Sequence, residues 1–163
     1  MSTSLEINKK APSFTAKDQQ GNTVSLKQFL GKKVILYFYP QDATPTCTVQ
    51  ACNLRDNFAL LTKQGFIVIG VSPDDANSHQ KFATKQQLPF ILLDDSNKKM
   101  IEKYGVWGEK QMYGRKYMGL HRTTFVIDEK GIINFTKGRA NTIKNYLAIQ
   151  GIDEKRIEID GKG

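Results

Sequence analysis

The two cysteines of this 163-residue chain, Cys47 and Cys52, lie five positions apart. An apolar run ends at Pro40, and Thr44 then offers a helix cap with Pro45 suited to the first helical position. Cys47 is therefore expected in the first turn of a helix, where unpaired N–H groups and the helix dipole favour a thiolate over a thiol. This placement makes Cys47 a candidate nucleophile and Cys52 a candidate to capture its product.

The spacing of the two cysteines creates a geometric conflict. Residues five apart in an ideal helix have Cα atoms about 8.7 Å apart, whereas a disulfide generally needs less than about 7 Å. The apolar positions Ala51 and Leu54 place Cys47 on the core-facing stripe of the helix, and Cys52 lies about 140° round the helix from it. If the two thiols react together, the helix must open around them.

The elements that position these cysteines alternate along the chain. The expected elements are a hairpin over 12–24, a short helix over 25–31, a strand over 34–39, a helix over 45–64, a strand over 66–71, a helix over 72–86, a strand over 89–93, a helix over 96–104, a long loop over 106–120, a hairpin with strands over 122–127 and 132–136, a helix around 143–147 and a charged segment over 152–163. A βαβ unit followed by a ββα unit predicts an α/β, thioredoxin-like fold. We expect a central mixed sheet flanked by helices, with an N-terminal hairpin extension, in a single domain over 1–163.

Composition and charge narrow the class of protein. The formal charge of +8 makes nucleic acid or an acidic membrane surface conceivable partners, but the basic residues come as scattered pairs that acidic residues interrupt. The segment 1–12 has no apolar stretch like a signal peptide, and no later run is as long as a membrane span. We therefore expect a soluble cytoplasmic protein with reduced cysteines and with neither nucleic acid nor membrane as a partner.

One set of residues resembles the active-site signature of the peroxiredoxins: Phe38, Pro40, Thr44 and Cys47, at the spacing Phe-x-Pro-x-x-x-Thr-x-x-Cys. The four-residue gap to Cys52, with the segments 104–110 and 121–128, is similar to the peroxiredoxin Q, or bacterioferritin comigratory protein, branch. The resemblance runs from position 11 to position 147 in the same order. Two positions depart from the pattern: Thr46 stands where that branch commonly has glycine, and Gln50 where many peroxiredoxins have glutamate.

The resemblance implies an antioxidant thiol peroxidase that reduces hydrogen peroxide and alkyl hydroperoxides without a metal or organic cofactor. It implies that Cys47 is the peroxidatic thiolate, which becomes a sulfenic acid, and that Cys52 is the resolving thiol, which condenses with it to an intramolecular disulfide. Thioredoxin or a similar dithiol is the expected reductant. We expect a monomer, because an intramolecular disulfide needs no second subunit, although the branch also contains dimers.

The resemblance also implies roles for residues around the thiolate. Thr44 would hydrogen-bond the thiolate and the peroxide through its hydroxyl, and Pro40 would shield the pocket from water. Arg122 would stabilise the thiolate and the charge that develops on the peroxide oxygens. Backbone N–H groups at Thr46 and Cys47 would complete the site. Of the two departures, Thr46 is expected to change how the peroxide reaches the thiolate. Gln50 is expected to weaken a hydrogen bond to Arg122.

Several alternatives stay open at this point. Without the resemblance, Cys47 would be interpreted as a small buried apolar residue. Cys52 would be an inert residue on the helix surface, and Arg122 would be a surface residue. A thiol-disulfide oxidoreductase or redox sensor would share the thiol chemistry, but the chain has no Cys-x-x-Cys.

The two histidines and the basic loop raise three further interpretations. A hydrolase could use Cys47 and His121 as a catalytic dyad. Because neighbouring residues of a strand point to opposite faces, only one of His121 and Arg122 can face the thiol. With His79, the chain has too few histidines for a persuasive zinc site. A basic binding module would use the aromatic residues of the loop 110–122 to stack on nucleotides.

Overall fold

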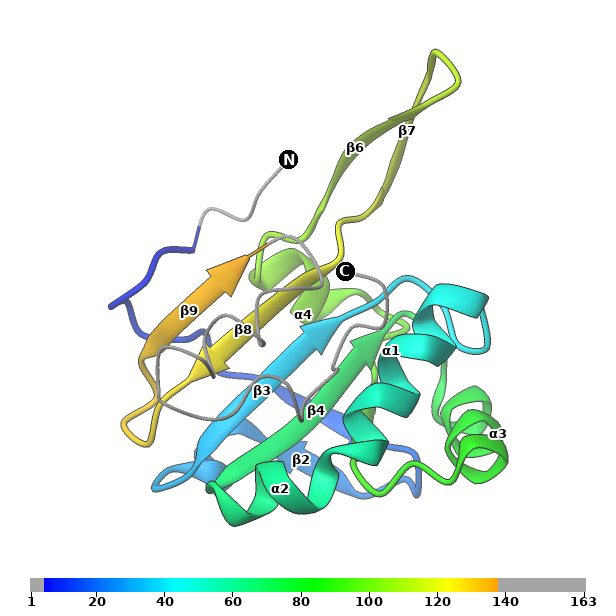
Figure 1. The fold of residues 1–163 in the computed structure, drawn as a ribbon. Helices are drawn as coiled ribbons and strands as arrows, with labels where there is room; N and C mark the ends of the chain where they lie inside the picture. Colours follow the sequence, from blue (N-terminus) through cyan, green and yellow to red (C-terminus); the bar gives the residue numbers. More distant parts are fainter. Residues whose placement is uncertain (1–4, 138–163) are drawn as a thin grey trace.

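A computed structural model describes residues 5–137. The strands are β1 (Thr15–Asp18), β2 (Thr23–Ser25), β3 (Lys33–Phe38), β4 (Phe66–Ser72), β5 (Ile91–Asp94), β6 (Trp107–Met112), β7 (Arg115–Leu120), β8 (Thr123–Ile127) and β9 (Ile133–Lys137). The helices are the 3-10 helix η1 (Leu26–Phe29) and the α-helices α1 (Pro45–Asp56), α2 (Phe58–Lys63), α3 (Ala76–Gln86) and α4 (Lys99–Lys103). Figure 1 shows their arrangement around a central sheet.

The central sheet has the strand order β2-β1-β5-β4-β3-β8-β9, and β6 and β7 form a separate two-stranded sheet. Strand β4 pairs in parallel with both β3 and β5, whereas β8 pairs antiparallel with β3. At the other edge, β1 pairs antiparallel with β5 and with β2. This mixed sheet with its N-terminal hairpin confirms the expected fold class. The single domain over 1–163 stays a prediction.

Both faces of the central sheet are covered, which explains the continuous apolar run of β3. Ile35 and Tyr37 lie in the cluster that contains residues of α1, α2 and α3. Val34, Leu36 and Phe38 lie in a second cluster on the opposite face, which contains residues of α4. A side-chain period of two then requires both sets of alternating positions from Val34 to Phe38 to be apolar.

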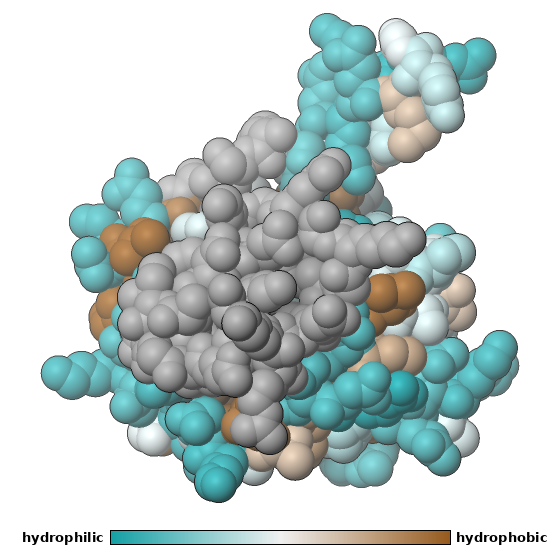
Figure 2. Space-filling view, in the orientation of Figure 1, coloured by the Kyte–Doolittle hydropathy of each residue, from teal (hydrophilic) through white to brown (hydrophobic). Residues whose placement is uncertain are grey.

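The segment 106–120 is not the loop that the sequence predicted. It is a β-hairpin, β6–β7, which projects from the body of the molecule in Figures 1 and 2. Its two turn residues, Tyr113 and Gly114, both have positive φ, at 51° and 76°, as a tight hairpin turn requires. The prediction was wrong because most of its side chains are exposed, so the strands carry no apolar alternation, and tyrosine replaces the usual asparagine of this turn.

Several helix boundaries also differ from the prediction. The helix expected over 96–104 is the shorter α4, and the one expected over 25–31 is the 3-10 helix η1. The helix expected over 45–64 is divided at Asn57, whose side chain donates to the carbonyl of Asn53 at 2.8 Å and so competes with the regular helix. The helix expected from Ser72 begins three residues beyond Pro73, because Asp75 is its N-cap and accepts from the Ser78 amide. The predicted helix around 143–147 and the segment 152–163 lie outside the described residues.

Candidate active site

Helix α1 begins where the sequence predicted. Thr44 is the N-cap residue with extended backbone, and Pro45 occupies the first helical position. The amide of Thr48 donates to the carbonyl of Thr44 at 2.8 Å, so the N–H groups of Thr46 and Cys47 precede the first intrahelical bond. Cys47 is 1% exposed and packs into the cluster between α1 and the sheet. The inward orientation expected for this thiol is confirmed.

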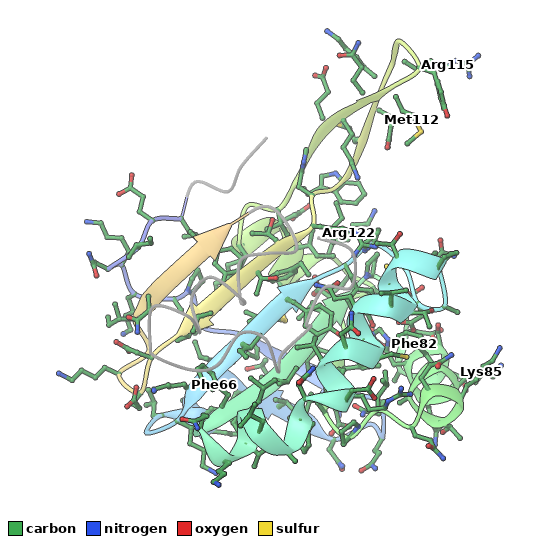
Figure 3. All side chains as sticks on the ribbon, viewed as in Figure 1. Phe66, Phe82, Lys85, Met112, Arg115 and Arg122 are labelled. Atoms are coloured by element: carbon green, nitrogen blue, oxygen red, sulfur yellow. The ribbon has the colours of Figure 1, made fainter. Side chains whose placement is uncertain are left out.

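Arg122 reaches the thiol from the start of β8, the strand that pairs with β3. It directly precedes β8, and the pairing of Phe38 with Thr123 carries it to the end of β3 from which the chain leads into α1. Its Nη2 donates to Cys47 Sγ at 2.7 Å, and Figure 3 shows it near the start of α1. His121 instead contacts the carbonyl of Glu109 through Nε2 at 3.1 Å. The choice of Arg122 over His121 as the partner of Cys47 agrees with this geometry.

Gln50 joins the thiol and the arginine in one cluster. Its side chain is buried, and its Oε1 accepts from Arg122 Nη1 at 3.2 Å. Arg122 thus donates to Cys47 and to Gln50 at once, so its planar guanidinium is held in a fixed orientation. The neutral amide keeps the hydrogen bond that the departure from glutamate put in question. Whether that bond is weaker than one to a carboxylate stays a prediction.

Thr44 and Pro40 lie on the segment that leads from β3 into α1. The Thr44 hydroxyl donates to the carbonyl of Gln41 at 3.2 Å, so the hydroxyl bond to the thiolate stays a prediction. Pro40 is half-buried and lines a hollow of about 570 Å³ together with residues of the hairpin base, among them Trp107 and Leu120. The base of the hairpin therefore lies beside Pro40, which the interpretation as a loop did not reveal.

Cys52 lies in different surroundings on the same helix. It is half-buried, and its thiol donates to Gln86 Oε1 at the end of α3, at 3.4 Å. Arg55 donates to the carbonyl of the same glutamine at 2.7 Å. Cys47 and Cys52 are both free thiols, and α1 is unbroken between them. The geometric conflict expected from their spacing is therefore present in this structure.

Three comparisons place these features among known proteins. A model of the AhpC/TSA family matches residues 7–136. A putative peroxiredoxin bcp of Coxiella burnetii is 49% identical over 131 residues, which cover 80% of this chain and 87% of that protein. Peroxiredoxin Bcp of Escherichia coli K12 is 48% identical over 143 residues, which cover 84% and 92%.

The chain belongs to the AhpC/TSA family. Its relatives place it in the peroxiredoxin Q, or Bcp, branch, so it is a thiol-dependent peroxidase. A solved structure of the bacterioferritin comigratory protein of Xanthomonas campestris, described for its alkyl peroxide reduction activity, is similar to the structure of this chain, with a TM-score of 0.76 and 27% identity over 85% of this chain and 88% of that chain. The resemblance carried by the cysteine motif is confirmed.

This peroxiredoxin also contains a buried polar network that the sequence did not reveal. The carboxylate of Asp42, between Pro40 and Thr44, is 2.7 Å from His79 Nδ1 on α3. The hydroxyl groups of Tyr39 and Ser78 donate to the same carboxylate at 2.6 and 2.8 Å. No local sequence pattern signals this contact, because Asp42 and His79 lie 37 positions apart.

Among residues 5–137, no group of three or more histidine, cysteine, aspartate or glutamate residues is placed to hold a metal ion. Within the same range, no helix is long and apolar enough to cross a membrane.

Proposed function

We propose that Cys47 is the peroxidatic residue of this peroxiredoxin. The observation that supports the proposal is the 2.7 Å contact between Arg122 Nη2 and the Sγ of a buried thiol at a helix start. The thiolate attacks one peroxide oxygen, the O–O bond breaks, and the other oxygen leaves as water or an alcohol once it has taken a proton. Sulfur and one oxygen form a sulfenic acid, so the thiol is oxidised and the peroxide is reduced.

The groups around Cys47 are proposed to stabilise the charge that moves during this step. Arg122 offers a fixed positive charge to the thiolate and then to the peroxide oxygens. The N–H groups of Thr46 and Cys47 point out of the helix start and add donors that need no reorganisation. Thr44 turns its hydroxyl toward the thiolate and peroxide, and Pro40 keeps water from the pocket.

We propose Cys52 as the resolving residue. Its thiol attacks the sulfenic sulfur, a disulfide forms and water leaves. For the two sulfurs to meet, the first turns of α1 must open and Cys52 must leave Gln86, to which it donates at 3.4 Å. An external dithiol, for which thioredoxin is our proposal, then reduces the disulfide and is itself oxidised to a disulfide.

Hydrogen peroxide and alkyl hydroperoxides are the proposed substrates. The relative from Xanthomonas campestris is described for alkyl peroxide reduction, and the apolar side chains of Trp107 and Leu120 beside Pro40 suit an alkyl group. We further propose that the protein acts as a cytoplasmic monomer, because both thiols of the cycle lie on one helix.

Stopped-flow measurement of peroxide consumption, with thioredoxin and its reductase as the electron source, tests the cysteine assignments. Cys47→Ser is expected to abolish turnover, and a wild-type rate in that variant would refute the mechanism. Cys52→Ser is expected to permit one fast turnover and to impair recycling. Mass spectrometry of the oxidised wild type should show a bond between Cys47 and Cys52, and its absence would refute the resolving role.

A further inference from the structure

We propose that Asp42 and His79 form a positioning pair that holds the loop before α1 in the geometry in which Cys47 reacts. The inference rests on the proposed role of Cys47 and goes beyond it, because neither Asp42 nor His79 contacts the thiol. We call Asp42 and its three side-chain partners, Tyr39, Ser78 and His79, the Asp42 clamp. The clamp connects the loop that carries Pro40 and Thr44 to α3.

The clamp is built from short contacts among largely buried side chains, and Asp42 and Ser78 also line a hollow of about 340 Å³ beside α3. Asp42 is 7% exposed, and Tyr39 and His79 are 1% and 0% exposed. One carboxylate oxygen accepts from the Tyr39 hydroxyl at 2.6 Å, and the other contacts His79 Nδ1 at 2.7 Å and accepts from Ser78 Oγ at 2.8 Å. The Asp42 amide donates to the carboxylate of Asp74 at 2.7 Å. Both the side chain and the backbone of Asp42 are therefore fixed.

His79 contributes a positive charge to the clamp. Its Nδ1 faces the Asp42 carboxylate, and its Nε2 is 2.8 Å from the carbonyl oxygen of Leu93. The Tyr39 hydroxyl, 3.4 Å from Nδ1, donates its proton to Asp42 instead. The nearest neighbour of each ring nitrogen is therefore an acceptor, so both nitrogens donate, and only the imidazolium form does so. Burial by itself lowers the pKa of His79, but the hydrogen bond and the charge of Asp42 raise it, and the net direction is upward.

The residue after Asp42 has a strained backbone conformation, which the clamp holds in place. Ala43 has φ of 62°, in the left-handed region that disfavours a side chain with a Cβ atom. Thr44 and Pro45 follow at once and start α1. Strain of this kind persists only when the surrounding contacts outweigh it. Without the contacts of Asp42, the turn at Ala43 relaxes and the start of α1, with Cys47, shifts away from Arg122.

The clamp therefore has opposite effects on the two steps of the proposed cycle. It favours the closed helix start in which Cys47 meets Arg122 and the peroxide. It opposes the opening of the same turns that brings Cys47 to Cys52. Loss of the clamp should slow the reaction with peroxide and leave disulfide formation as fast as in the wild type or faster.

Asp42→Asn and His79→Gln test the inference in rapid-mixing experiments that follow the fluorescence of the single tryptophan, Trp107. Each variant is expected to lower the second-order rate constant for hydrogen peroxide by about 10- to 100-fold, because small displacements of reacting groups have effects of this size. The later phase, disulfide formation, should not slow. A combined Tyr39→Phe and Ser78→Ala variant removes two neutral donors and should slow the peroxide step about fivefold.

The matched control is Asp95→Asn. Asp95 is also a buried carboxylate, at 1% exposure, but it accepts from the amides of Met100 and Ile101 on α4. This variant should lower the melting temperature while both rate constants of the folded protein stay at the wild-type values. Peroxide rate constants within twofold of the wild type in folded Asp42→Asn and His79→Gln would overturn the inference. If Asp42→Asn does not fold, an unchanged rate in the combined variant would do so.

The free energy of unfolding, measured over a series of pH values, tests the positive charge on His79. The pKa of His79 is raised in the folded state, so its contribution to stability is complete below the unfolded value of about 6.5 and is lost as the pH rises through the folded value. Asp42, Asp74, Asp94 and Tyr39 are the titratable groups that face it. The difference in unfolding free energy between wild type and His79→Gln should shrink as pH rises, and a constant difference would contradict an imidazolium in the clamp.

Cys47→Ser, measured in parallel, separates this inference from the proposed function. Turnover in Cys47→Ser would refute the assignment of the peroxidatic thiol. An inactive Cys47→Ser together with unchanged peroxide rates in the Asp42 and His79 variants would refute the positioning pair alone.

Discussion

The two thiols of α1 lie on one helix in unlike surroundings. Cys47 is buried and receives a charged donor, Arg122, at 2.7 Å. Cys52 is half-buried and makes a 3.4 Å contact with a neutral amide, Gln86. Hydrogen bonds that involve a charged group are roughly twice as strong as neutral ones. The helix thus holds one thiol firmly and the other weakly, as expected for a nucleophile and for a partner that must move.

The neighbours of the two thiols differ in the same way. Cys47 follows a loop whose residue Asp42 is fixed by a buried ion pair to α3. Cys52 contacts only the last turn of that helix, at Gln86. The comparison indicates that α3 restrains the start of α1 through a strong contact and Cys52 through a weak one. The following experiments test the difference, from the largest expected effect to the smallest.

The arginines beside the two thiols offer the largest contrast. Arg122→Gln should lower the rate constant for peroxide by roughly 10²- to 10³-fold, the usual effect of removing one donor to a developing negative charge. Arg55→Gln is the matched control, because Arg55 lies beside Cys52 and donates to the Gln86 carbonyl. It should leave the peroxide step unchanged. Stopped-flow kinetics measures the rate constant for peroxide in both variants. A decrease of less than fivefold in Arg122→Gln would contradict the expected difference between the two arginines.

Opening of the helix should control how quickly Cys52 captures the oxidised Cys47. Val49 is 47% exposed and lies in α1 between them. Alanine and glycine at this position differ by about 1 kcal/mol in helix propensity. Val49→Gly should therefore form the disulfide about fivefold faster than Val49→Ala, with equal rates for peroxide. Single-turnover kinetics with one equivalent of peroxide measures both phases, and equal disulfide rates would show that opening is not limiting.

The weakest contact should give the smallest effect. Gln86→Ala removes the acceptor of the Cys52 thiol, a bond in which sulfur is only a weak donor. In a Cys47→Ser background, alkylation of Cys52 by iodoacetamide should become about twofold faster, since little free energy is released with such a bond. An alkylation rate that rises tenfold or more would mean that α3 holds Cys52 as firmly as it holds the start of α1, where Cys47 lies.

The elements that were predicted well carry strong local signals. The apolar run of β3 and the cap and proline before α1 each depend on residues a few positions apart. The hairpin β6–β7 was missed because it pairs two mostly exposed strands, in which few side chains report a buried face. Asp42 and His79 were not connected because they lie 37 positions apart, on a loop and on a helix that only the folded sheet brings together.

The sequence by itself determined the helix start, the place of Cys47 in its first turn and the conflict with Cys52, because capping and helix periodicity act over a few residues. Only the tertiary structure decided which groups surround each thiol. Arg122 lies 75 positions from Cys47 and reaches it because β8 pairs with β3. Contacts of this kind depend on strand pairing and on the packing of α3 against the sheet, which no local pattern encodes.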